Sequence, residues 1–196
     1  MIARAERFFT PEEYLIIERN AEFKSEYVAG KIYAMAGASV EHNLITANVA
    51  GEFYVQLKGG GCRTYASDMR VCTSPEGLYT YPDVTVGCGE PETLDGHGDV
   101  LLNPTVIVEV LSPSTEAYDR GDKAEHYRQL ASLTDYILIS QDRCRVEHFA
   151  RQGEHAWLLS EYTSVTDQVV LGAIGCTLRL SDIYATLAPE KFAASP

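Results

Sequence analysis

Two segments in the first third of the chain have apolar residues at helical spacing. The first, "TPEEYLIIERN", opens with Thr10 as a typical N-cap, Pro11 at the first helical position and Glu13 three residues after the cap. This combination predicts a short helix. The second, "SVEHNLITANVAGEFYVQLK", follows Ser39 with apolar side chains near a 3.6-residue period, which predicts an amphipathic helix.

Other segments alternate between apolar and polar residues, as strands do. "SEYVAGKIYAMAG" alternates around Ala29 and Gly30, which predicts a tight hairpin. In "YPDVTV", Pro82 cannot donate a hydrogen bond to a neighbouring strand, so we expect the strand proper to start at Asp83. The strands predicted in this part of the chain lie at about 62–66, 70–73 and 79–87.

The second half of the chain begins with a loop rich in Gly, Pro and acidic residues, which precedes a strand of β-branched residues at 105–111. A helix is predicted from there to about Ser132. Residues 135–162 contain three strands separated by short turns, which is typical of a meander. The tail from Cys176 predicts one more strand and a short helical end.

The order of these elements predicts an α/β or α+β sandwich with a mixed β-sheet. With 196 residues, 45% of them hydrophobic, the chain can form one sizeable core, so we expect a single domain over 1–196. No apolar run has the length of a membrane span, and "MIARAERFFTPEEY" lacks the apolar stretch of a secretory signal. We therefore expect a cytoplasmic protein with no membrane partner.

Charge and cysteine content narrow the possible functions. A net charge of -12 counts against tight non-specific binding of nucleic acid, because such binding comes from Lys and Arg side chains that displace counterions from phosphates. Five cysteines without a CxxC pair argue against a disulfide framework and against a zinc site. We expect all five to be reduced, mostly as thiols that fill the core: Cys62, Cys72, Cys88, Cys144 and Cys176.

Candidate chemistry centres on Glu109, which lies within the β-branched strand. A carboxylate buried in a strand costs free energy unless it is paired or binds a metal. Residues two apart share a strand face, so Glu109 should lie with Ile107 and Leu111. If the strand that starts at Asp83 is a neighbour, two carboxylates converge, and they would suit a hard divalent cation such as Mg²⁺.

The helix after this strand could supply a cation. Asp119, Lys123 and Tyr127 recur every four residues and should project from one helical face. The simpler interpretation of Lys123 is a salt bridge to Glu109 or Asp119, and that of Asp83 is a turn residue after a proline. Both interpretations stay open at the level of single residues.

The motifs "YPDVTV", "VIVEVLSPSTEAYDRGDKAEHY" and "TDYILIS", preceded by "MAGASVEHNLI" and "YASDMRV", resemble those of the Uma2 family. This family, also called domain of unknown function 820, is assigned to the PD-(D/E)XK nuclease superfamily. The resemblance extends from about Thr10 to Ile183, and "EVLSPST" with the Asp, Lys and Tyr after it is its most specific part. It implies a restriction-endonuclease-like mixed β-sheet flanked by helices, commonly found as a homodimer.

The resemblance also implies an activity and a set of site residues. The activity is a divalent-metal-dependent endonuclease that hydrolyses phosphodiester bonds of nucleic acid, with DNA as the first expectation. Asp83 and Glu109 match the metal ligands, which would hold Mg²⁺ or Mn²⁺. Leu111 occupies the usual lysine position two residues after Glu109, and Lys123 on the next helix is implied to take that role. Glu41 matches an acidic residue that related nucleases use as an outer metal partner.

Two classes of function therefore remain. A catalytic nuclease is favoured because Asp83, Glu109 and Lys123 are all present. A binding or regulatory module that keeps the fold without the chemistry is favoured by Leu111 and by the scarcity of basic residues. Because one fold can support both, only the properties of the site can separate them.

Overall fold

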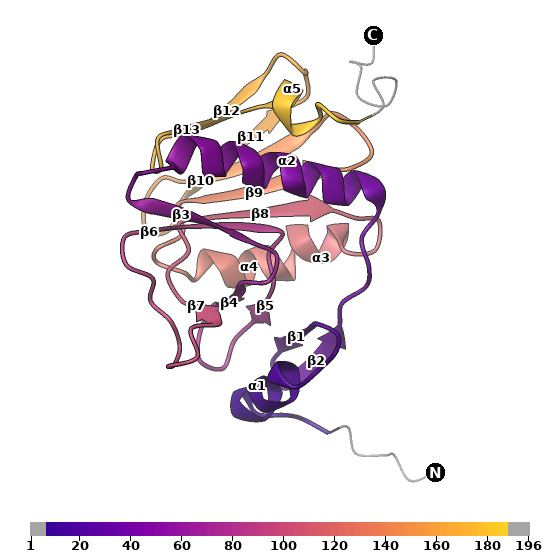
Figure 1. Cartoon of the computed structure of the whole chain (residues 1–196), viewed down its shortest axis with the longest axis vertical. Helices are drawn as coiled ribbons and strands as arrows, with labels where there is room; N and C mark the ends of the chain where they lie inside the picture. Colours follow the sequence, from indigo (N-terminus) through magenta and orange to yellow (C-terminus); the bar gives the residue numbers. More distant parts are fainter. Residues whose placement is uncertain (1–6, 188–196) are drawn as a thin grey trace.

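The computed structural model describes residues 7–187, so the two ends of the expected 1–196 domain, residues 1–6 and 188–196, lie outside it. It shows a mixed α+β architecture built around a six-stranded sheet (Figure 1). Helix α2 (Val40–Leu57) covers one face of this sheet and α4 (Asp122–Arg128) covers the other. The predicted mixed sheet flanked by helices is confirmed.

The central sheet has the strand order β11-β10-β9-β8-β6-β3. Strands β8 and β9 pair in parallel, and the other neighbours pair antiparallel. The predicted meander is confirmed as β9, β10 and β11. The bounds of the six strands are β3 (Cys62–Ala66), β6 (Val84–Cys88), β8 (Val106–Leu111), β9 (Asp135–Ser140), β10 (Val146–Arg151) and β11 (Trp157–Tyr162).

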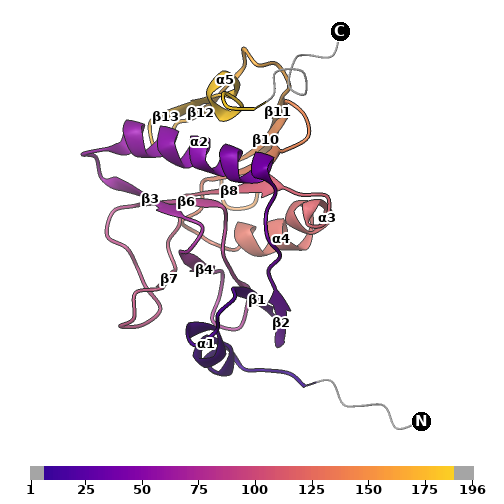
Figure 2. The same ribbon diagram turned by 45° about the vertical axis from the view of Figure 1, so that its right-hand side comes forward.

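A second sheet of five short strands, in the order β2-β1-β5-β4-β7, lies with helix α1 (Pro11–Arg19) on the side of the central sheet opposite α2 (Figure 2). It divides the strand expected at 79–87, because residues before Pro82 join this sheet and residues after it join the central one. It also adds a strand within the expected loop 89–104. The bounds are β1 (Ser25–Val28), β2 (Lys31–Ala34), β4 (Arg70–Cys72), β5 (Tyr79–Thr80) and β7 (Val100–Leu101).

The predicted N-terminal elements form for the expected reasons. Helix α1 (Pro11–Arg19) has a complete capping box, in which Thr10 and Glu13 each accept a hydrogen bond from the other's backbone N–H. The hairpin between β1 and β2 turns at Ala29 (φ 46°) and Gly30 (φ 89°), both in the left-handed region that favours a two-residue hairpin loop.

The helical segment after β8 differs from the expected continuous helix. It consists of α3 (Glu116–Arg120) and α4, which are separated at Gly121. Downstream, an unexpected strand β12 (Gln168–Leu171) pairs with β13 (Cys176–Arg179), and the short helix α5 (Leu180–Ile183) follows. These last elements pack on the same core as α2.

Alternation along β8 separates two cores. Val106, Val108 and Val110 pack in the core beneath α2, whereas Ile107 and Leu111 pack in the core beneath α4. All five side chains are buried. The face predicted for Glu109, shared with Ile107 and Leu111, is therefore confirmed.

The expectation of five reduced cysteines is wrong for two of them. Cys62 and Cys88 occupy directly opposed positions of the antiparallel strands β3 and β6, with their Cα atoms 4.0 Å apart, and form a disulfide. Their pairing depends on strand register, which the number and spacing of cysteines do not reveal. The remaining thiols, Cys72, Cys144 and Cys176, are buried and free, as expected.

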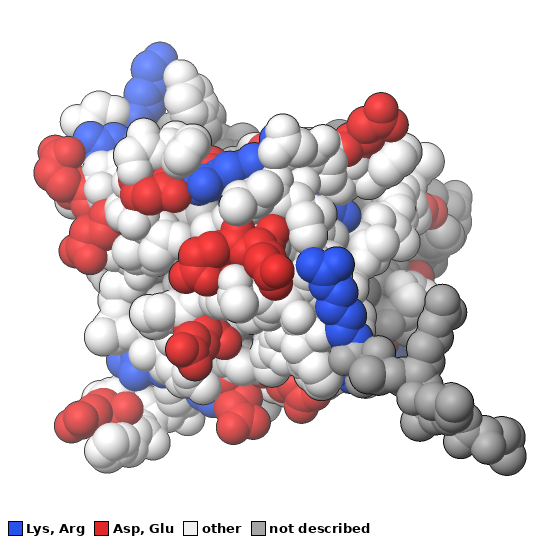
Figure 3. All heavy atoms as spheres, turned by 90° about the horizontal axis from the view of Figure 1, so that it is seen from below, with Lys and Arg blue, Asp and Glu red and all other residues white. Residues whose placement is uncertain are grey.

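The surface reflects the acidic composition. On the face shown in Figure 3, Asp and Glu side chains gather near the centre while Lys and Arg lie apart from one another. Within residues 7–187, no helix combines the length and apolar character needed to cross a membrane.

Candidate active site

A cleft of about 1270 Å³ opens where β8, the start of α2, the β1–β2 hairpin and the α3–α4 segment approach one another. Its wall includes the carboxylates of four residues from four separate segments, together with one lysine and one histidine that contact them. These residues are Glu26, Asp83, Glu109, Asp119, Lys123 and His42. The cleft therefore brings together most of the polar residues that the sequence singled out.

Glu109 lines the cleft and is only 4% exposed. Its Oε1 accepts a hydrogen bond of 2.7 Å from the hydroxyl of Tyr127 and lies 2.9 Å from Nζ of Lys123. Burial raises the pKa of Glu109, although Lys123 opposes this change. Lys123 and Tyr127 share one face of α4, as expected, and both contact Glu109. Asp119, expected on the same helix, lies on the separate helix α3 but still comes within 3.5 Å of Lys123.

Lys123 is shared among three carboxylates and its side chain is only 6% exposed. Its Nζ lies 2.9 Å from Glu109, 3.0 Å from Glu26 and 3.5 Å from Asp119. Burial acts to lower the pKa of Lys123, but the surrounding carboxylates outweigh it and raise the pKa above its usual value. The surrounding carboxylates thus favour the charged form of this side chain.

Asp83 lies in the connection between β5 and β6. Because Val84 pairs with Val108 across the two antiparallel strands, the register places Asp83 beside Glu109. Oδ2 of Asp83 accepts a 2.7 Å hydrogen bond from the backbone N–H of Val110 and lies 3.2 Å from Nε2 of His42. The carboxylate is thus oriented by the strand that carries Glu109.

The first turn of α2 contains both Glu41 and His42. Burial acts to lower the pKa of His42, but the hydrogen bond and charge of Asp83 outweigh it, so the pKa is raised. Glu41 is half-buried and does not belong to the residues that line the cleft. Its role as an outer metal partner stays a prediction.

Two polar residues of the segment "YASDMRV" form structural contacts near the cleft. Asp68 forms an ion pair of 2.9 Å with Lys24, and Arg70 is buried against Tyr81. Both residues therefore form polar pairs at or near the ends of strands. Glu26, by contrast, is a cleft residue that the sequence interpretation missed.

The charges of the cleft fit a cation. Carboxylates outnumber ammonium groups among the lining residues even with Lys123 present: Glu26, Asp83, Glu109, Asp119, Asp122 and Glu125 against Lys24 and Lys123. Oδ1 of Asp83 and Oε2 of Glu109 stand outside the hydrogen bonds described above. Hard oxygen donors of this kind suit Mg²⁺ or Mn²⁺. Within residues 7–187, however, no three His, Cys, Asp or Glu side chains are already arranged as a closed metal site.

Comparison with known proteins identifies the family. A family model, Uma2, described as "Putative restriction endonuclease", matches residues 11–181. The chain belongs to the Uma2 family. The resemblance seen in the sequence motifs is thus confirmed over most of the chain, and family and fold together indicate a restriction-endonuclease-like nuclease.

Curated relatives of this Uma2 protein come from Synechocystis sp. One, the "Uncharacterized protein sll1609", is 37% identical over 161 residues, which cover 82% of this chain and 91% of the relative. Another, the "Uncharacterized protein slr1290", is 36% identical over 179 residues, which cover 91% of this chain and 93% of the relative. These relatives match the chain over nearly their full lengths.

A solved structure supports the fold. The crystal structure of "a putative nuclease belonging to DUF820" from Anabaena variabilis superimposes with a TM-score of 0.75, covering 90% of this chain and 98% of the other. The two sequences are 19% identical, so this likeness concerns the fold. The restriction-endonuclease-like fold expected from the sequence is confirmed.

Proposed function

We propose that this Uma2 protein is a divalent-metal-dependent endonuclease, with DNA as its first candidate substrate and Mg²⁺ or Mn²⁺ as its cofactor. The observation that carries the proposal is the convergence at one cleft of Asp83, immediately before β6, and Glu109 on the neighbouring strand β8, with the ammonium of Lys123 2.9 Å from Glu109. Divalent metals are general in restriction-endonuclease-like enzymes, and the excess of carboxylates here supports the same requirement.

Asp83 and Glu109 would hold the metal. When bound, the metal would supply Lewis-acid polarisation of a phosphate and a lowered pKa for a coordinated water. Lys123 would direct a fixed positive charge toward the phosphate oxygens, where negative charge grows during phosphodiester hydrolysis. The N–H of Val110 and the ring of His42 would fix the orientation of Asp83. The outer role of Glu41 belongs to this proposal as well.

The second candidate is a binding or regulatory module with the nuclease fold but without hydrolysis. Leu111 in the usual lysine position and a net charge of -12 favour it, because the acidic chain would attract a polyanion weakly. A homodimer and a cytoplasmic location are compatible with either candidate and remain predictions.

Calorimetric titration of metal-stripped protein with Mn²⁺ and with Mg²⁺ tests the proposal without a choice of substrate. Wild type should bind metal, whereas Asp83→Asn and Glu109→Gln should each weaken binding at least about tenfold. Asp182→Asn on α5, away from the cleft, is the matched control and should bind as wild type does. Absence of binding up to millimolar metal would instead support the non-catalytic module.

A binding-competent protein should then be incubated with double-stranded DNA, single-stranded DNA and RNA in the presence of the bound metal. Cleavage that requires metal and disappears in Glu109→Gln would support the endonuclease. Metal binding without cleavage of any of the three nucleic acids would favour the binding module.

A further inference from the structure

Glu26 contributes to the cleft from the second sheet, because it lies on β1 rather than on a strand of the central sheet. Its side chain is 13% exposed, and Oε1 lies 3.0 Å from Nζ of Lys123. The hydroxyl of Thr80, on the adjacent strand β5, donates a hydrogen bond to the same oxygen. Glu26 is therefore oriented on one side by a buried donor and faces the ammonium on the other.

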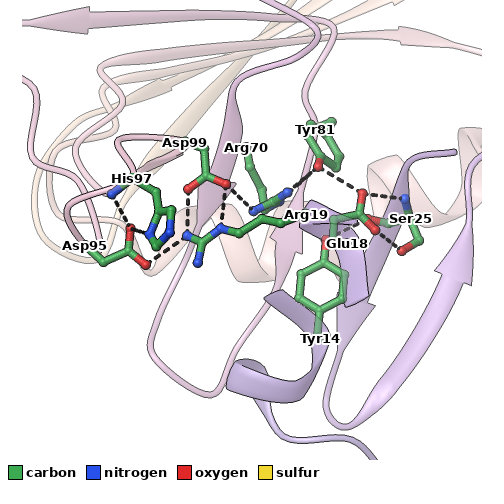
Figure 4. A network of polar contacts seen from close by, with 9 residues as sticks. All are labelled: Tyr14, Glu18, Arg19, Ser25, Arg70, Tyr81, Asp95, His97 and Asp99. Atoms are coloured by element: carbon green, nitrogen blue, oxygen red, sulfur yellow. Dashed lines mark hydrogen bonds and ion pairs between the residues drawn. The ribbon is translucent and has the colours of Figure 1, made fainter. Parts of the chain in front are cut away.

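The backbone next to Glu26 is fixed by a buried polar network (Figure 4). The carboxylate of Glu18 accepts hydrogen bonds from the backbone N–H and the hydroxyl of Ser25, and from the hydroxyl of Tyr81 at 2.9 Å. Arg70 in turn donates to the hydroxyl of Tyr81. Because successive strand residues point to opposite faces, the network anchors Ser25 while Glu26 points toward Lys123.

A lysine side chain has a flexible four-carbon stem, so a single partner leaves its ammonium poorly fixed. Here two carboxylates from different sheets lie within 3.0 Å of the ammonium of Lys123. A cation bound at Glu109 would repel this ammonium and compete for the same carboxylate. Glu26 would still attract it, since Glu26 belongs to a different strand and sheet.

We propose that Glu26 is a positioning residue for Lys123, which holds the ammonium beside Glu109 and keeps it in the cleft when Glu109 engages a cation. The catalytic consequence of this role rests on the endonuclease function proposed above. The contact itself does not depend on that function, so the two ideas can be tested separately.

The first test measures the acylation rate of Lys123 by an amine-reactive ester, followed by peptide mass spectrometry. Loss of the charge in Glu26→Gln should speed acylation of Lys123 at least about tenfold, which corresponds to about 1.4 kcal/mol of lost interaction. Glu22→Gln, an exposed acidic residue just before β1, is the matched control and should leave the rate unchanged. Glu26→Asp, which keeps the charge, should restore part of the protection.

Two results of this test would overturn the positioning role. One is an acylation rate of Lys123 in Glu26→Gln within about twofold of wild type, because the ammonium would then be held without Glu26. The other is an equal rise at Lys24, since β1 as a whole would then have loosened.

The second test measures cleavage kinetics. If Glu26 positions Lys123, Glu26→Gln should lower kcat by about 10²-fold while KM changes less than about threefold, because misplacing a catalytic group affects the transition state more than substrate binding. Unchanged kcat in an active enzyme would overturn the role. Faster acylation of Lys123 in a protein that neither binds metal nor cleaves nucleic acid would support positioning and refute the endonuclease proposal.

Discussion

Replacing Lys123 by methionine would remove the ammonium from the cleft while keeping most of the aliphatic stem. Three carboxylates lie within 3.5 Å of that ammonium, and those of Glu109 and Asp119 are buried. Breaking a buried ion pair by removing one partner typically costs about 3–5 kcal/mol, because the other charge stays buried without compensation. We expect Lys123→Met to lower the free energy of unfolding by about that amount.

Removing one carboxylate instead should lower the free energy of unfolding much less. In Glu109→Gln the amide oxygen can still accept hydrogen bonds from Tyr127 and Lys123, and the ammonium keeps Glu26 and Asp119 as partners. The expected loss is below about 1.5 kcal/mol, the usual range for one hydrogen bond. The double variant Lys123→Met/Glu109→Gln should be more stable than Lys123→Met alone, because it removes one of the uncompensated charges.

Urea unfolding at equilibrium, followed by circular dichroism, measures these differences directly. The same titration with Mn²⁺ adds a second readout, since a cation that binds the folded state at 100 times its dissociation constant stabilises it by about 2.7 kcal/mol. We expect Mn²⁺ to stabilise Lys123→Met more than it stabilises wild type, because the divalent cation compensates the carboxylates that lost their ammonium.

Two outcomes would refute this reasoning. If Lys123→Met lowered the free energy of unfolding by less than about 1 kcal/mol, the buried carboxylates would not need the ammonium for compensation of their charge. If Glu109→Gln lowered the free energy of unfolding as much as Lys123→Met does, then loss of the lysine would cost no more than loss of one carboxylate, and the reasoning would be wrong. In both cases, equal m-values in the variants and wild type are needed for the comparison.

Three further predictions concern other parts of the molecule. A thiol assay should find three reactive thiols in unfolded, unreduced protein and five in reduced protein. The variant Cys62→Ser/Cys88→Ser should have a free energy of unfolding lower by up to about 3.5 kcal/mol, because the disulfide closes a loop with a sequence separation of 26. Tyr127→Phe should lower the free energy of unfolding by about 1–2 kcal/mol in urea titrations, because buried Glu109 loses its hydroxyl donor. Hydrogen bonds from Arg19 lower the pKa of Asp99 from 3.8 to about 2. They therefore stabilise the folded state above pH 3.8, and this stabilisation is lost as the pH falls toward 2. In urea titrations across this range, the free energy of unfolding should depend less on pH in Asp99→Asn than in wild type.

The elements that follow from local rules were predictable. The capping box of α1 and the hairpin at Ala29 and Gly30 depend on neighbouring residues, and both form as expected. The face of Glu109 followed from alternation along one strand, and the i,i+4 spacing placed Lys123 and Tyr127 toward it. Each of these inferences needs only the geometry of a single element or of one turn.

The features that depend on pairing between distant segments were not predictable in the same way. Glu26 gives no local signal, since an acidic residue in a short strand is ordinary until that strand is placed beside Lys123. The disulfide required the register of β3 against β6. The change of sheet at Pro82 was visible only as a strand start, because the sequence does not show which neighbour each half joins.

The two residues of the contact between Glu26 and Lys123 are synthesised at different times. The two residues are 97 positions apart (123 minus 26), so β1 is synthesised well before α4. At roughly 5–20 residues per second, the interval on the ribosome is about 5–20 s. A chain that ends after Glu26 but before Lys123 contains the acidic strand β1 but lacks the ammonium that pairs with it. The complete cleft therefore exists only in chains whose synthesis has passed α4.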